Sequence, residues 1–423
     1  MIQIQLIREK ADWVKERLAV KNFKETELVD EIVELDLQRR KNLTIIEENK
    51  AKQNEISKSI GQLMQQGKKE EAEQSKQTVA NLKSEVAASE EALKQIEKEQ
   101  FDKLIQLPNL PAAEVPLGKT PEENVEIRQG GNIPTLAANA VPHWDLCKKY
   151  NLIDFELGNK ITGSGFPVYV NKGAKLQRSL IQYFLDFNTE AGYTEYLPPF
   201  MVNADSAFAT GQLPDKEGQM YFATEDNFYL IPTAEVPVTN VYRDTILKDT
   251  ELPVKMTAYS PCFRREAGSY GKDVRGLNRV HQFEKVEIIQ ITHPDESFKV
   301  LDEMVAHVEK LLQSLELPYR ILRLCGGDMG FASAITYDFE VFSAAQQRWL
   351  EVSSVSNFES FQTNRMKCRF KTEGGKTQLC HSLNGSSLAL PRIVASLLEN
   401  CQTEAGIKLP AALVKYFGKE MID

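Results

Sequence analysis

The side chains best suited to binding or catalysis are arginines and carboxylates that occur near a phenylalanine, past the middle of the chain. Segments 256–265 and 280–289 are rich in β-forming residues, and the loop between them, residues 267–277, contains three glycines. This pattern predicts an antiparallel β-hairpin. The two strands of such a hairpin would bring residues far apart in the sequence onto one surface.

Side chains alternate between the two faces of a strand, so the spacing predicts which of them lie together. Arg264 and Glu266 share a face of the first strand, while Arg265 points away. In the second strand, one face carries His281, Phe283, Lys285 and Glu287. The opposite, core-facing side carries Val280, Val286 and Ile288.

The shared polar face has the parts needed to bind ATP and an amino acid. An arginine binds phosphate oxygens as a planar fork, and a carboxylate can pair with an ammonium group or accept a hydrogen bond from an adenine amine. A phenylalanine can stack on a purine. The alternative is a solvated ladder of cross-strand charges. The position of Phe283 among the charges, with a separate apolar face for the core, favours the binding site.

The hairpin also resembles a known family. Phe-Arg-Arg-Glu at 263–266, followed by Arg-x-x-Gln-Phe at 279–283, is similar to the second signature motif of class II aminoacyl-tRNA synthetases, in the form found in seryl-tRNA synthetases. Residues 193–202 resemble the first motif, whose proline lies at a dimer interface, and either Pro198 or Pro199 occupies that position. Residues 384–392 resemble the third motif. A homodimer is implied by this resemblance.

The resemblance also implies a role for individual residues. The catalytic residues would be Arg264 and Arg392, which stabilise phosphoryl charge. The implied ATP contacts are Arg264, Arg265, Glu266, Val280, Phe283, Glu351, Val352, Ser353, Ser354 and Arg392. The implied serine contacts are Thr233, Ala234, Glu235, Glu287, Asn384 and Ser386. Mg²⁺ accompanying ATP would contact Glu351 and Ser354.

Taken alone, the shorter motifs also fit ordinary structure. Thr233 and Glu235 are two residues apart, which predicts one face of an exposed strand end. The stretch 351–354 fits a capped turn, although its hard oxygen ligands suit Mg²⁺ bound to phosphates. His281 faces the predicted site but could equally be structural. The sequence departs from the usual family pattern at Ser387, Phe342 and Cys325-Gly326.

A different pattern occupies the amino-terminal quarter of the chain. A three–four spacing over residues 28–63 selects Leu28, Ile32, Leu35, Arg39, Asn42, Ile46, Asn49, Gln53, Ile56, Ile60 and Leu63. Over residues 72–96 it selects Ala72, Ser75, Val79, Leu82, Val86, Ser89, Leu93 and Ile96. This spacing predicts two coiled-coil helices that reverse at Gln65-Gln66-Gly67 into an antiparallel hairpin. Polar residues along the seam, such as Arg39 and Asn49, are expected to fix its register.

The helical hairpin has two interpretations. A dimerisation or spacer coiled coil is the commoner use of heptads. Lysines interleaved with glutamates near the tip, at positions 50, 52, 58, 68, 69, 76 and 83, are usually just solvated. The resemblance instead implies an arm that binds the long variable arm of tRNA(Ser).

The prolines at 108 and 111 cannot continue a helix and mark a domain boundary. We therefore predict a tRNA-binding domain at 1–108, with the coiled-coil arm, and a class II catalytic domain at 109–423. Short β-rich runs alternate with helical patterns in the second part, which predicts an α+β fold with a mainly antiparallel sheet.

Composition limits the remaining function classes. The chain has 423 residues, 42% of them hydrophobic, which is enough for two domains with a large core. A net charge of −9 argues mildly against a generic nucleic-acid binder, although RNA can bind local basic patches. The six cysteines lack a Cys-x-x-Cys pair, so free, mostly buried thiols are expected, without disulfides or a structural zinc. With neither signal peptide nor membrane span recognisable, cytoplasmic residence is the default expectation.

Together these features predict serine–tRNA ligase activity. L-serine and ATP would form seryl adenylate and pyrophosphate, and serine would then pass to the 3′-terminal adenosine of tRNA(Ser), and of tRNA(Sec) where that tRNA exists. The loop 267–278, with Lys272 and Arg275, would guide the acceptor end or else be a mobile surface loop. One alternative is a paralogue that loads an amino acid onto a carrier protein, which would not need the arm. Another is an inactive scaffold, which would not need the site residues.

Overall fold

The structure is a computed structural model that describes residues 1–267 and 275–423, so Lys272 lies outside the described residues. The chain divides into two compact units. The helical unit comprises Met1–Ala19 and Phe23–Pro108, and the sheet unit comprises Val20–Asn22 and Asn109–Asp423. Across the described ranges, no helix combines the length and the apolar character that crossing a bilayer requires.

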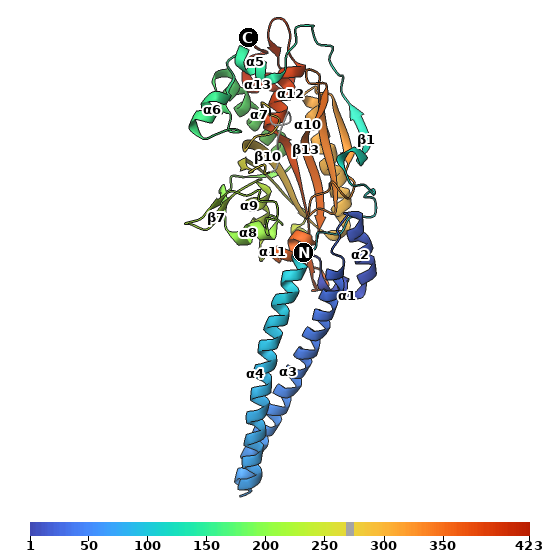
Figure 1. The fold of residues 1–423 in the computed structure, drawn as a ribbon, viewed down its shortest axis with the longest axis vertical. Helices are drawn as coiled ribbons and strands as arrows, with labels where there is room; N and C mark the ends of the chain where they lie inside the picture. The colour runs from blue at the N-terminus through green and yellow to red at the C-terminus, as the bar shows by residue number, and fades with distance from the viewer. Residues whose placement is uncertain (268–274) are drawn as a thin grey trace. The chain divides into compact units, whose positions relative to one another are not determined.

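The helical unit is dominated by two long helices. After α1 (Ile4–Glu9) and α2 (Ala11–Val20) come α3 (Glu27–Gln65) and α4 (Lys69–Leu104), which run side by side (Figure 1). Gly67 has a φ of +76° in the turn between them, a conformation that glycine adopts without strain. Every predicted seam position in both helices is buried or half-buried. The prediction of an antiparallel helical hairpin is therefore confirmed.

Polar side chains of the seam bond across the hairpin. Arg39 Nε donates to Glu97 Oε1 at 3.0 Å, and Asn49 Nδ2 donates to Glu85 Oε2 at 3.2 Å. A slip of the helices past each other would break both bonds, which supports the expectation that these residues fix the register.

The sheet unit is built on an eight-stranded sheet in the order β1-β11-β12-β13-β16-β10-β9-β4. The strands are β1 (Val125–Gly130), β4 (Thr194–Tyr196), β9 (Val254–Phe263), β10 (Gln282–Thr292), β11 (Tyr319–Arg323), β12 (Ile335–Ser343), β13 (Arg348–Glu359) and β16 (His381–Ala389). Neighbouring strands pair antiparallel, except that β4 is parallel to β9. The prediction of an α+β fold with a mainly antiparallel sheet is confirmed.

Helices and short strands surround this sheet. The helices are α5 (His143–Lys149), α6 (Phe155–Ile161), α7 (Asn171–Glu190), α8 (Ala204–Ala209), α9 (Glu235–Thr239), α10 (Ser297–Ser314), α11 (Phe361–Met366), α12 (Leu390–Asn400) and α13 (Ala411–Phe417). The short strands are β2 (Ile153–Asp154), β3 (Val168–Tyr169), β5 (Met201–Val202), β6 (Phe222–Ala223), β7 (Phe228–Leu230), β8 (Ile246–Lys248), β14 (Arg369–Lys371), β15 (Thr377–Leu379), β17 (Ile407–Lys408) and β18 (Met421–Ile422).

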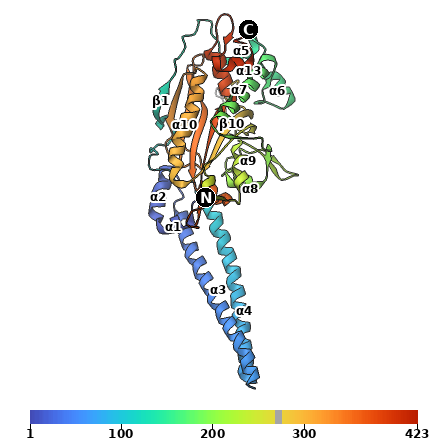
Figure 2. The same ribbon diagram turned by 180° about the vertical axis from the view of Figure 1, so that it is seen from behind.

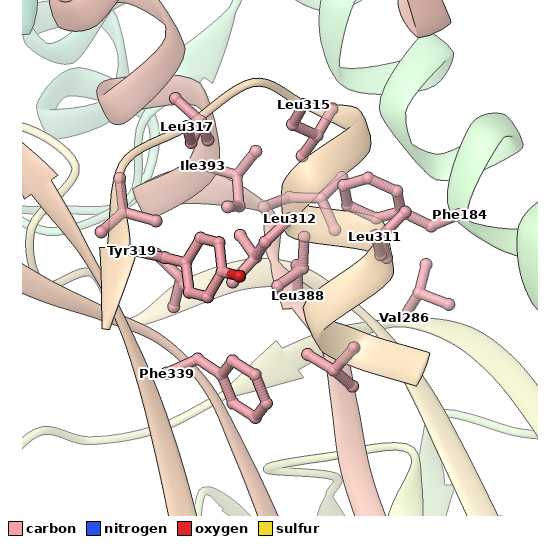
Figure 3. Close-up of a cluster of buried hydrophobic side chains, with 14 of the residues drawn as sticks. Phe184, Val286, Leu311, Leu312, Leu315, Leu317, Tyr319, Phe339, Leu388 and Ile393 are labelled. Carbon is pink, nitrogen blue, oxygen red and sulfur yellow. The ribbon is translucent and has the colours of Figure 1, made fainter. Parts of the chain in front are cut away.

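The main hydrophobic core lies between the sheet and the helices α7, α10 and α12. Figure 2 shows α10 lying against the sheet, and Figure 3 shows Leu312 of α10 and Ile393 of α12 among the core side chains. Val286 and Ile288 of β10 are fully buried in this core, as their spacing predicts. The alternating residues Phe283, Lys285 and Glu287 therefore point away from it.

The predicted β-hairpin is confirmed as β9 paired with β10, in a register that places Phe263 opposite Gln282. Its first strand ends one residue before Arg264, so the prediction that Arg264 and Glu266 lie in a strand is wrong. Glu266 has a φ of +48°, and Arg265 N–H donates to Gln219 O at 2.9 Å. The Arg264 N–H still bonds across the hairpin to His281 O at 2.9 Å, and the chain turns out of the sheet at Arg265, whose N–H finds its partner outside the ladder.

Val280 also departs from its predicted place. Because β10 begins at Gln282, alternation does not extend back to Val280. Val280 is buried in a small cluster with Cys262 and Phe283, instead of with Val286 in the main core.

All six cysteines are free thiols, and all but the half-buried Cys401 are buried, as predicted. Burial raises the pKa of the Cys147 thiol to about 12. Such thiols behave as small apolar side chains.

Candidate active site

A cavity of about 350 Å³ opens in the sheet unit beside β10 and β13. Its lining residues are Arg264, Glu266, Leu277, Asn278, Arg279, Val280, Phe283, Lys285, Glu351, Val352, Ser353, Ser354, Ser386, Ala389, Pro391 and Arg392. The cavity thus gathers most of the predicted ATP-binding residues from three separate stretches of the sequence. Its size is within the usual range of small-molecule sites.

Arg264 and Phe283 form one wall of the cavity. The Arg264 guanidinium lies 5.2 Å from the centroid of the Phe283 ring, and its Nε donates to Pro232 O at 3.3 Å. Glu266 lies next to them, where its carboxylate accepts from Arg279 Nη1 at 2.8 Å. Arg265 does not line the cavity, and its guanidinium lies 6.0 Å from the centroid of the Tyr221 ring.

A second part of the lining comes from the junction between β16 and α12. Pro391 occupies the first turn of α12, where its fixed φ and missing N–H suit a helix start. Arg392 Nε donates to Asn278 O at 3.0 Å, and Arg392 Nη1 donates to Glu351 O at 2.7 Å. The positive end of the helix dipole and two arginines therefore border one cavity, which favours an anionic ligand.

The stretch 351–354 lies within β13, and this excludes the alternative of a capped turn. Ser353 Oγ donates to Ser386 O at 2.6 Å, which ties β13 to β16 at the cavity. Ser354 Oγ donates to Asp338 Oδ1 at 2.6 Å. Burial raises the pKa of the Asp338 carboxyl, and the negative charge of Glu351 adds to this shift.

Next to the cavity, buried polar side chains gather around Glu287. Thr233 Oγ1 donates to Glu287 Oε1 at 2.6 Å, and Lys285, which is 6% exposed, forms an ion pair with the same carboxylate. Within the described part of the chain, no group donates a hydrogen bond to the buried Oε2 of Glu287. A buried carboxylate oxygen without a partner is costly, so this atom is suited to receive a donor from a ligand.

Glu235 lies in the same region but not on a strand. It begins α9, and its N–H donates to Thr233 Oγ1 at 3.2 Å, so the predicted strand face for Thr233 and Glu235 is wrong. Gln362 Nε2 donates to Glu235 Oε1 at 2.6 Å. Burial raises the pKa of the Glu235 carboxyl to about 7, and repulsion from Glu287 adds to the shift.

Of the other predicted serine contacts, only one lines the cavity. Ser386 lines the cavity and is 8% exposed. Asn384 is half-buried in β16, opposite Ile289, and is not among the lining residues. The side chain of Ala234 packs in an apolar cluster with Val238, so only its backbone could contact a ligand.

Comparison with known proteins gives the family. Residues 1–111 match the family model of the seryl-tRNA synthetase N-terminal domain, and residues 221–401 match the tRNA synthetase class II core domain (G, H, P, S and T). The serine–tRNA ligase of Salinibacter ruber is 49% identical over 99% of this chain and 98% of its own length. The chain belongs to the seryl-tRNA synthetase family.

Solved structures of this family share the fold. The seryl-tRNA synthetase from Pyrococcus horikoshii complexed with ATP is 32% identical, with a TM-score of 0.91 over 100% of this chain and 99% of that chain. The cytoplasmic serine-tRNA ligase from Naegleria fowleri in complex with AMP is 28% identical, with a TM-score of 0.90 and the same coverage. No finding supports the alternative of a carrier-protein paralogue.

The sequence motifs assign no role to three residues that contact the candidate site. Lys285 was placed on the correct strand face, but its pairing with Glu287 was not inferred. Gln362 of α11 and Asp338 of β12 enter through contacts with Glu235 and Ser354 that no local pattern reveals.

Other residues singled out from the sequence do not line the cavity. The His281 ring stacks on Phe166 with centroids 5.5 Å apart, and its Nδ1 lies 3.0 Å from Arg264 O. Ser387 is fully buried and donates to Asn188 Oδ1 at 3.0 Å. Phe342 packs edge-on against Trp349, and Cys325 and Gly326 are buried away from the cavity.

Proposed function

We propose that this chain joins L-serine to tRNA(Ser) in two steps that consume ATP. The observation that carries the proposal is the juxtaposition of a cavity bearing Arg264 and Arg392 with the buried carboxylate of Glu287. The first part suits a nucleotide triphosphate and the second suits the ammonium group of an amino acid. Membership in the seryl-tRNA synthetase family supports serine as that amino acid.

In the first step, a carboxylate oxygen of serine attacks the α-phosphorus of ATP, and pyrophosphate leaves. Arg264 would hold the α-phosphate, while Arg392 and the amino end of α12 would hold the leaving pyrophosphate. Phe283 and Glu266 would contact the adenine. No side chain needs to form a covalent bond, because positioning and electrostatic stabilisation account for catalysis of this kind.

The residues at the cavity fit a magnesium ion accompanying ATP. The Glu351 carboxylate is half-exposed there, and the Ser354 hydroxyl donates its proton to Asp338, which leaves its oxygen lone pairs available. Two hard oxygen ligands from protein suit Mg²⁺, whose other ligands are phosphates and water. The ion would neutralise phosphate charge while Glu351 and Ser354 hold it. Among the described residues, no cluster of three or more metal-ligating side chains occurs.

The serine ammonium would bind the free Oε2 of Glu287, with Glu235 as a second carboxylate nearby. Thr233 and Ser386 would supply hydrogen-bonding groups at the same site. Buried polar groups left unpaired by the wrong amino acid would provide discrimination.

The raised pKa of the Glu235 carboxyl predicts that serine activation depends on pH. With a pKa of about 7, the Glu235 carboxyl is mostly neutral below pH 7 and charged above it. Because only the charged form attracts an ammonium, kcat/KM for serine in pyrophosphate exchange should rise as the pH passes through about 7. Glu235→Gln should abolish this rise. Glu284→Gln should retain it, since Glu284 is a half-buried carboxylate with a raised pKa that bonds Gln177 and does not line the cavity. A rise that persists in Glu235→Gln would contradict the assignment.

In the second step, the 3′-hydroxyl of the terminal adenosine attacks the acyl carbon of seryl adenylate, and AMP leaves. Arg275 would contact the acceptor end, and Lys272, outside the described residues, remains a prediction. The helical hairpin α3–α4 would bind the long arm of tRNA(Ser), and tRNA(Sec) would be a further substrate.

The lysines near the tip of the helical hairpin provide a test. Lys50, Lys68 and Lys76 form ion pairs with Glu90, Glu71 and Glu73. Among the described residues, no ion-pair partner occurs for Lys52, Lys58, Lys69 or Lys83. Replacing these four by serine should raise the KM for tRNA about tenfold or more and flatten its salt dependence, since each lost phosphate contact lowers the slope.

The matched control replaces Lys50, Lys68 and Lys76 by serine, which should have a smaller effect because those charges are already neutralised. Pyrophosphate exchange should be unchanged in both variants. Equal effects of the two sets on tRNA charging would contradict a specific role for the unpaired lysines.

The proposed activity is tested by pyrophosphate exchange with a panel of amino acids. Serine should stimulate exchange best, and better stimulation by threonine or proline would overturn the assignment. We further propose a homodimer in the cytoplasm. Exposed apolar side chains beside Pro198 and Pro199, such as Leu197 at 80% exposure, support a surface that a second copy would cover.

A further inference from the structure

A closed ring of hydrogen bonds holds the chain where it returns to β10. Leu277 N–H donates to His143 Nε2 at 2.8 Å, and Asn278 Nδ2 donates to Gln346 Oε1 at 3.0 Å. Leu277 and Asn278 both line the cavity, whereas His143 and Gln346 do not. The ring therefore fixes part of the cavity wall from behind.

A buried carboxylate closes the ring. His143 Nδ1 lies 2.6 Å from Glu399 Oε1, and Gln346 Nε2 donates to the same oxygen at 2.9 Å. The side chains of His143 and Glu399 are both fully buried. Because Nε2 accepts from Leu277, Nδ1 carries the proton and donates it to Glu399. One tautomer of His143 thus satisfies both neighbours.

The ring is connected to a residue of the cavity. Asn278 O accepts from Arg392 Nε at 3.0 Å, and Arg392 and Glu399 lie at the two ends of α12. The backbone at Gly276 also passes close to the His143 ring. Gly276 has a φ of +66°, and a Cβ there would lie 2.2 Å from His143 Nε2. A larger residue would push the segment away from His143.

We propose that His143 is a positioning residue for ATP binding. By fixing Leu277 and Asn278, it holds the carbonyl that orients the Arg392 guanidinium toward the phosphates. This inference rests on the proposed function, in which the cavity binds ATP. It concerns ATP and not serine, because Glu287 and Glu235 bond to Thr233 and Gln362 and, among the described residues, not to the ring.

Two substitutions of His143 test its two ring hydrogen bonds one at a time. Asparagine can donate from near the Nδ1 position but has no acceptor for Leu277, whereas glutamine can place an acceptor near the Nε2 position. His143→Asn should therefore raise the KM for ATP in pyrophosphate exchange about tenfold, the effect of one lost hydrogen bond. His143→Gln should raise it less than about threefold. The KM for serine should stay within about twofold of wild type in both.

Gln402→Ala is the structural control. Gln402 Nε2 donates to Val141 O and Glu399 O close to His143, whereas Leu277 and Asn278 bond to His143 and Gln346. This substitution should lower the thermal midpoint without changing the KM for ATP. Equal rises in His143→Asn and His143→Gln, or a rise in Gln402→Ala as large as in His143→Asn, would overturn the inference.

A direct measurement separates this inference from the proposed function. Calorimetric titration with ATP alone should show the same order. Wild type and His143→Gln should bind ATP more tightly than His143→Asn does. If wild type binds ATP but exchanges pyrophosphate with no amino acid, the proposed function fails while the titration still decides the role of His143. Equal ATP affinities in all three proteins would overturn that role.

Discussion

Arg264→Ala is expected to lower kcat for serine-dependent pyrophosphate exchange by about 10²–10³-fold, the usual effect of removing one donor that stabilises transition-state charge. The guanidinium lines the cavity and is oriented by Pro232 O and the Phe283 ring. Arg264→Lys should recover only part of the activity, because a lysine is a point charge and cannot form the planar fork. Exchange rates at saturating ATP and serine provide the measurement.

The effect of Arg264→Ala is best compared with that of Arg265→Ala. The family resemblance implies that Arg265 also contacts ATP, whereas its guanidinium lies over Tyr221 and outside the cavity lining. The geometry predicts a much smaller effect for Arg265→Ala than for Arg264→Ala. Equal losses in the two variants would support the resemblance over the geometry. Arg243→Ala, in which the lost guanidinium contacts Asn203 and Ser206, controls for loss of an arginine elsewhere.

Local periodicity explains what could be predicted from the sequence. The seam of α3 and α4 and the alternation of β10 depend on the geometry of single elements, so the spacing of apolar residues was sufficient. Phe283, Lys285 and Glu287 were placed on one face for this reason. The third motif was placed by its resemblance to the family motif at 384–392, and Pro391 in the first turn of α12 fits the helix start there.

Predictions failed where an element ended earlier than its residue types suggested. Arg264 to Glu266 continue a β-like composition, yet Glu266 adopts a left-handed conformation that no residue preference indicates. Thr233 and Glu235 follow an apolar run, but a short helix begins at Glu235. In the first case the Arg265 N–H bonds to Gln219 O, which is distant in the sequence, and in the second the Glu235 N–H bonds to the Thr233 hydroxyl, so neither N–H takes part in a strand ladder.

Residues that act through other residues were missed for a related reason. Gln362 has no motif of its own, and its importance comes from a 2.6 Å bond to Glu235, which is 127 positions earlier in the chain. His143 and Leu277 are 134 positions apart. Such contacts depend on the packing of whole elements, which a single sequence does not specify.

The second large effect concerns stability. Glu287→Ala is expected to lower the free energy of unfolding by about 3–5 kcal/mol, because it leaves Lys285 as a buried charge without its partner. It should also abolish serine-dependent exchange, since the carboxylate proposed to bind the ammonium is gone. Urea denaturation at neutral pH measures the first effect, and the KM and kcat for serine measure the second.

The stability loss and the activity loss must then be separated, and a double substitution does this. Changing both Lys285 and Glu287 to methionine removes the pair together, and replacing a buried ion pair by apolar side chains of similar size is often neutral or stabilising. The double variant should therefore be more stable than Glu287→Ala yet remain unable to activate serine. Recovered exchange in a stable double variant would mean that Glu287 serves folding, not substrate binding. Persistent inactivity with full stability would leave recognition of the ammonium as its role, since the fold would then be intact and only the buried carboxylate missing.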